Sequence, residues 1–118
     1  EVHDELATGI ATEVHHIFPK SQFPMIASYY ENLILLTSSQ HRQKAHPKGN
    51  TQVVDRDYQL TCLMAKSQTI EASLNEGNNF YRKESFIYVV NTGLDEHIEE
   101  TISFVDIRKF LVNKYLEF

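Results

Sequence analysis

The chain has 118 residues, a net charge of −5 and one cysteine. This length provides for one domain with one core, and no apolar run approaches the roughly 20 residues that cross a bilayer. Because no such run is present, we expect a soluble globular domain. A single cysteine excludes an internal disulfide and a Cys-x-x-Cys zinc knuckle, which predicts a reducing, cytoplasmic setting. Because the sequence opens with Glu1 instead of Met and lacks a secretory signal, we expect it to be a piece of a longer protein.

The charge is distributed unevenly along the chain. Residues 14–48 carry four basic residues against one acidic residue, a net charge of +3, whereas the remainder carries −8. The overall negative charge disfavours a grip on nucleic acid by the whole surface, but a local basic segment can contact a few phosphates. The alternative is that these charges only solvate a loop and a helix. The basic residues of the segment are Lys20, Arg42, Lys44 and Lys48.

Two strands separated by a long loop are predicted near the start of the chain. Thr12–Phe18 predicts a short strand that ends before a proline, which cannot donate a ladder hydrogen bond. Pro19–Tyr30, with two prolines and mixed polarity, predicts a loop. Asn32–Thr37 predicts a buried strand by its length and aliphatic content, although periodicity alone leaves a helix open.

A short helix is expected directly after the second strand. Ser38 or Ser39 would cap a helix that runs toward Ala45. The segment Pro47–Asn50 would stop it. The order is therefore strand, loop, strand, helix.

The second half of the chain predicts a scaffold of two helices and a further strand. Asp57–Leu74 carries a mostly apolar stripe at helical spacing, and Phe104–Tyr115 does the same after a predicted cap at Ser103. Phe86–Val90 is rich in β-branched and aromatic residues and predicts a strand. The fold class that follows is α+β, a single domain with a core at about residues 12–48 and a scaffold at about 55–118.

Two tyrosines in this scaffold are candidates for stacking on nucleic-acid bases. Tyr81 and Tyr88 flank or occupy the predicted strand. Aromatic residues at strand spacing more often pack in a core. Core packing is therefore the prediction for both.

Four of the six histidines lie between residues 15 and 46. Hydrolysis of a phosphodiester needs an activated water and neutralisation of the phosphoryl charge, and imidazole can serve as a base or as a metal ligand. Adjacent residues on a strand point to opposite faces, so one of His15 and His16 would bind metal while the other meets the water. His41 would complete the metal site from the helix, and Asn32 would hydrogen-bond backbone across the loop.

The position of His46 leaves two alternatives open. It follows His41 by five residues, which on an ideal α-helix turns it about 140° away instead of stacking it on the same face. His46 is therefore either a third ligand or phosphate contact, or a residue that ends the helix.

Three segments in this order resemble the HNH nuclease motif. They are Glu13–Ser21, Glu31–Leu36 and His41–Pro47, and together with the loop between them they span about a third of the chain. The family folds as a β-hairpin and a helix that grip one divalent metal, the ββα-metal arrangement. The resemblance therefore implies that fold and a metal-dependent endonuclease.

The resemblance also implies a role for each motif residue. His15 would be the first metal ligand, His16 the general base, Asn32 the loop-fixing asparagine and His41 the second ligand. Lys20, Arg42, Lys44 and Lys48 would position the phosphate backbone. Many HNH proteins add Cys-x-x-Cys pairs that bind a structural zinc, but the corresponding residues are Thr37 and Gln40, so that zinc should be absent.

The identity of the metal and of the partners is bounded more loosely. Imidazole suits zinc, nickel or manganese, whereas the family resemblance implies Mg²⁺ or Mn²⁺. A weaker resemblance of residues 50–67 and 86–88 to bacterial restriction-type HNH proteins implies DNA cleavage in restriction or defence, with a recognition region elsewhere in the full-length protein. A homodimer would suit cleavage of two strands. The alternative is a catalytically inactive module that binds metal or nucleic acid with the same hairpin and helix.

Overall fold

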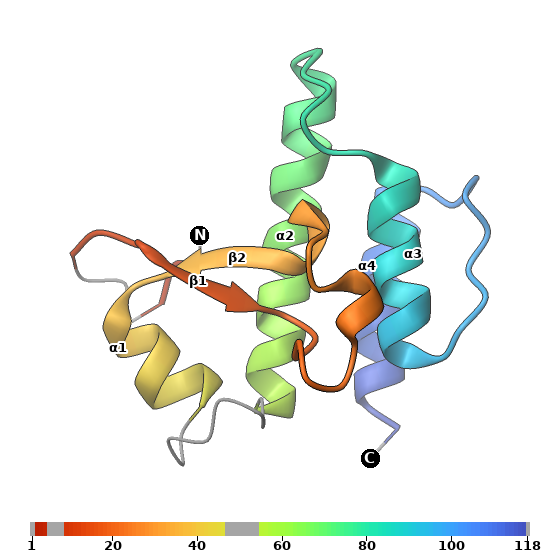
Figure 1. Ribbon diagram of the computed structural model, residues 1–118. Helices are drawn as coiled ribbons and strands as arrows, with labels where there is room; N and C mark the ends of the chain where they lie inside the picture. Colours follow the sequence, from red (N-terminus) through yellow and green to blue (C-terminus); the bar gives the residue numbers. More distant parts are fainter. Residues whose placement is uncertain (1, 5–8, 47–54, 118) are drawn as a thin grey trace.

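A two-stranded hairpin lies across a group of helices in the computed structural model, which describes residues 2–4, 9–46 and 55–117 (Figure 1). β1 (Glu13–His16) pairs antiparallel with β2 (Leu33–Leu36). In the register, Val14 faces Leu35 and His15 faces Ile34. Both predicted strands are confirmed, each shorter than its predicted range.

The loop between the strands contains two turns of 3₁₀-helix, η1 (Pro24–Ile26) and η2 (Tyr30–Asn32). Pro24 begins η1, where its missing N–H costs no helical hydrogen bond. The side chain of Ile26 is fully buried. The loop is therefore anchored to the core at its centre.

The helix after β2 has two parts. α1 (Ser38–Gln40) runs into η3 (His41–Ala45), a π-helical turn. The cap is Thr37, not Ser38 or Ser39: the Thr37 hydroxyl accepts from the Gln40 N–H at 3.1 Å, and the Gln40 side chain accepts from the Thr37 N–H at 3.0 Å. This reciprocal capping box satisfies two donors where either serine would satisfy one, which corrects the predicted start. The predicted stop at 47–50 lies outside the described residues.

Two long helices of the second half match their predictions. α2 (Arg56–Asn75) begins after Asp55, whose carboxylate accepts from the Tyr58 N–H at 2.8 Å. α4 (Phe104–Tyr115) begins after Ser103, whose hydroxyl accepts from the Asp106 N–H at 3.1 Å. Both caps supply acceptors for N–H groups that a helix start leaves unpaired.

The further strand predicted at Phe86–Val90 is wrong, because these residues lie in α3 (Lys83–Leu94). Phe86, Ile87, Val89 and Val90 are all buried, while Tyr88 is exposed. Positions 86, 87 and 90 share one side of a helix, so this apolar run satisfies a helical burial pattern as well as a strand's. Packing against neighbouring elements overrides the β preference of the side chains. In the described part of the chain the sheet has two strands, and the α+β class is confirmed.

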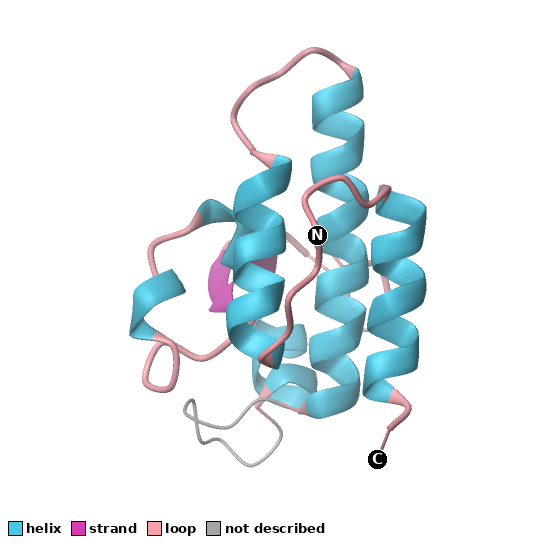
Figure 2. Ribbon diagram, turned by 90° about the vertical axis from the view of Figure 1, so that its right-hand side faces the viewer, coloured by secondary structure: helices cyan, strands magenta, loops and turns pink. Residues whose placement is uncertain are grey.

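The core lies where α2, α3 and α4 run side by side, next to the hairpin (Figure 2). Phe18, at the start of the loop, packs so closely on α3 that a Cβ at Gly93 would overlap its ring. No described helix combines the length and apolar content that crossing a bilayer requires. Fully buried core residues include Ile17, Phe18, Ile26, Leu36, Cys62, Leu63, Ile70, Phe86, Val89, Ile107 and Leu111.

Candidate metal centre

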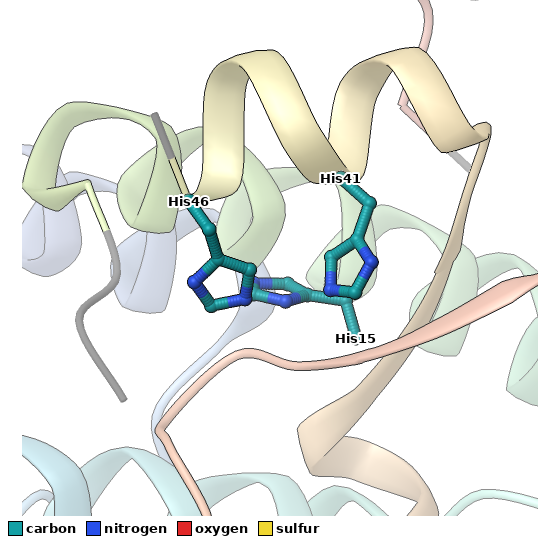
Figure 3. A group of neighbouring side chains, drawn as sticks. All are labelled: His15, His41 and His46. Carbon is teal, nitrogen blue, oxygen red and sulfur yellow. The ribbon is translucent and has the colours of Figure 1, made fainter. Parts of the chain in front are cut away.

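Three histidines converge between the hairpin and the helix that follows it (Figure 3). His15 comes from β1, His41 begins η3 and His46 follows its last residue. One ring nitrogen from each lies within 4.8 Å of the other two. The ring centroids are separated by 5.3 Å for His15–His41, 5.1 Å for His15–His46 and 4.9 Å for His41–His46. The three residues are close enough to hold one metal ion.

The π-helical turn explains why His46 belongs to this group. The His46 N–H donates to the His41 carbonyl at 3.1 Å, a hydrogen bond between residues five apart. In an α-helix the same spacing would turn the side chain away, whereas a π turn aligns residues i and i+5. His46 therefore both ends the helix and joins the cluster, and the geometry that sequence periodicity disfavoured is produced by a local change of helix type.

The most buried member of the cluster is suited to donate a lone pair. His15 is 1% exposed, and its Nε2 has no hydrogen-bond partner in the described structure. Burial, reinforced by the neighbouring His46 and His41, lowers the pKa of His15 to about 3. The imidazole is therefore neutral near pH 7, as a metal ligand must be. An unpaired buried nitrogen costs about 1–3 kcal/mol, and coordination to a cation would remove that cost.

A carboxylate orients the second histidine. Glu13 Oε1 lies 3.0 Å from His41 Nδ1, so His41 Nε2 is the nitrogen left for a metal. Carboxylate–histidine pairs of this kind fix the tautomer and ring orientation of metal ligands. The sequence contained the signal for this contact, because Glu13 stands two residues before His15 and a strand places such residues on one face.

Asn32 joins the two ends of the loop beside the site. Its Oδ1 accepts from the Phe18 N–H at 2.9 Å, and its Nδ2 donates to the Phe18 carbonyl at 3.1 Å. Its backbone carbonyl accepts from the Ile17 N–H at 2.8 Å. The side chain is fully buried. Asn32 thus holds the backbone just beyond His16, as expected from its place before β2.

The histidine cluster opens into a pocket of about 580 Å³. His16 is half-buried and lines this pocket together with the three clustered histidines. Arg42 and Lys44 lie on η3 but do not line the pocket, and Lys48 lies outside the described residues. The remaining residues that line it are Val14, Pro19, Lys20, Ser21 and Pro24. The structure therefore brings His16 and Lys20 to the histidine cluster and leaves Arg42 and Lys44 outside the pocket.

Comparison of the chain with protein-family models, with curated proteins and with solved structures gives no match. The HNH resemblance therefore depends on the motif residues and on the geometry of the pocket.

Proposed function

We propose that the chain is a metal-dependent HNH endonuclease that hydrolyses DNA phosphodiester bonds. The observation that carries the proposal is one pocket shared by a three-histidine cluster and an accessible fourth histidine, His16. The cluster is contributed by a hairpin and the helix directly after it, which is the chain order of a ββα-metal site. A restriction or defence role is the biological setting that we propose with it.

The ligand set limits which cation the site would take. His15, His41 and His46 offer nitrogen alone, and among the described residues no carboxylate belongs to the cluster. Three imidazoles favour Zn²⁺ or Ni²⁺, whereas Mg²⁺ and Mn²⁺ prefer oxygen ligands. The ligand set therefore favours Zn²⁺ or Ni²⁺ in affinity, whereas the motif implies Mg²⁺ or Mn²⁺ as the working ion, bound with water and substrate oxygens as further ligands. A bound divalent cation would neutralise charge on the phosphate and on the leaving oxygen.

The protein's own residues would supply the proton transfer and the positioning. His16 would accept a proton from the attacking water, since an imidazole titrates near the working pH. Lys20, exposed at the rim of the pocket, would contact a phosphate oxygen. Arg42 and Lys44 would contact the backbone farther along the bound strand. Asn32 would keep the backbone after His16 in place through its bonds to Phe18.

Nicking of supercoiled plasmid tests this proposal. The purified chain is incubated with Mg²⁺, Mn²⁺, Ni²⁺ or Zn²⁺ and with an EDTA control. We expect His16→Ala to lower the nicking rate by about 10²- to 10⁴-fold with metal affinity unchanged, whereas His41→Ala should weaken metal binding itself. His97→Ala is the matched control, because His97 is exposed and outside the pocket.

Two outcomes would contradict the proposal. Nicking by His16→Ala at the wild-type rate would remove His16 from the role of base. Metal binding by calorimetry without nicking in any metal would instead support the inactive binding module.

A further inference from the structure

An apolar cleft of about 310 Å³ lies beside the hairpin, next to the histidine pocket. It is formed by β2, by the loop before it, by α2 and by the segment that joins α2 to α3. The described residues that line it are Val14, Tyr30, Leu33, Ile34, Leu35, Lys66, Thr69, Phe80 and Tyr81.

Four large apolar side chains in this cleft are open to solvent. Val14 is 54% exposed, Tyr30 56%, Leu35 44% and Phe80 58%. The rings of Tyr30 and Phe80 lie 4.7 Å apart with planes tilted by 32°. Single exposed apolar residues need no explanation, but a contiguous group of them marks a binding surface. This group presents aromatic faces.

The cleft also carries a cation at its base. Lys66 is 6% exposed, and its Nζ donates to the Tyr81 hydroxyl at 2.9 Å. An ammonium has three donors, and the Tyr81 hydroxyl is the one acceptor for them in the described structure. No carboxylate of the described residues lines the cleft, although the buried carboxylate of Glu31 lies near enough to act electrostatically on Lys66 and Tyr81. The cleft is therefore complementary to an electron-rich, planar ligand.

The cleft and the histidine pocket adjoin each other at one residue of β1. Val14 lines both of them. In the register of the hairpin, Val14 pairs with Leu35 and His16 pairs with Leu33. Because residues two apart share a face, Val14 and His16 lie on the same side of β1 as the cleft. A chain-like ligand bound at His16 can extend one monomer farther into the cleft.

We propose that this cleft binds an unstacked nucleobase of a single-stranded nucleic acid, adjacent to the phosphodiester held in the histidine pocket. The position of that phosphodiester rests on the proposed function. In a duplex the faces of the bases are hidden, so the exposed Tyr30 and Phe80 rings can stack only on an unpaired base. Stacking does not depend on charge, and it supplies affinity that a chain of net charge −5 cannot gain from phosphates alone. Lys66 would donate to a carbonyl or ring nitrogen of the base.

Fluorescence anisotropy of labelled oligonucleotides tests this inference. Binding is measured in EDTA to a single-stranded 12-mer, to the same strand in a duplex and to a 12-mer of abasic nucleotides. We expect the single strand to bind tightest. Phe80→Ala and Tyr30→Ala should each weaken single-strand binding by about 5- to 150-fold, the effect of losing one stacked base. Phe80→Tyr should restore it.

Tyr88→Ala provides the matched control, since Tyr88 is an exposed aromatic residue on α3 that does not line the cleft. Unchanged binding by Phe80→Ala, or equal binding of the duplex and abasic strands, would overturn the inference. So would a wild-type dimer in sedimentation that Phe80→Ala dissociates, because the cleft would then be an interface between copies. Measurement in EDTA separates this test from the proposed function, because binding is then measured without metal. Absence of nicking would not contradict base binding in the cleft, and absence of base stacking would not contradict the metal site.

Discussion

Protonation of His15 should destabilise the fold at acidic pH. The unfolded chain binds a proton at this residue near pH 6.5, whereas the folded chain, which buries His15 among two other histidines, does so only near pH 3. Between these values the unfolded state holds the additional proton, so lowering the pH favours unfolding. The full stability is present above pH 6.5. The loss attributable to His15 is about 1 kcal/mol at pH 5.5 and about 3 kcal/mol at pH 4.5.

Urea unfolding in EDTA at pH 7.5, 5.5 and 4.5 measures this loss. His15→Gln removes the titrating group, so the free energy of unfolding of this variant should fall less than that of the wild type by the amounts given above. A constant offset between the two proteins, caused by the changed side chain, cancels in the comparison across pH. His97→Gln, at an exposed histidine, should keep the wild-type pH dependence. Parallel curves for wild type and His15→Gln would refute the reasoning.

Two further changes test the supports of the site. Glu13→Ala should weaken binding of Zn²⁺ or Mn²⁺ by about 10- to 100-fold in calorimetry, nearer the lower value because the Glu13 side chain is 39% exposed, and an unchanged Kd would show that Glu13 does not orient His41. Asn32→Ala should lower the free energy of unfolding by about 2–5 kcal/mol, since it leaves the N–H and carbonyl of Phe18 buried without these partners. A loss below about 1 kcal/mol in urea unfolding would show that water or backbone movement replaces both bonds.

Helices and strands could be predicted where capping residues and hydrophobic periodicity within a short segment specify them. Ser103 and the apolar stripe behind it predict α4 because capping and helical periodicity act within one or two turns. The strands β1 and β2 follow from a proline, a loop and an aliphatic run in the same way. The strand predicted at Phe86–Val90 was wrong, because this segment is apolar on nearly every side. Only packing against neighbouring elements decides whether such a segment forms a strand or a helix.

For the candidate site, the sequence by itself determined the residue types and their order: paired histidines on one strand, an asparagine before the next, and two more histidines on the following helix. Tertiary structure alone decided that His46 joins His15 and His41, because the π turn that aligns them depends on how the helix packs on the hairpin. It also decided the cleft beside the site. Tyr30, Lys66 and Phe80 lie far apart in sequence, and no periodicity relates residues that meet only when separate elements pack together.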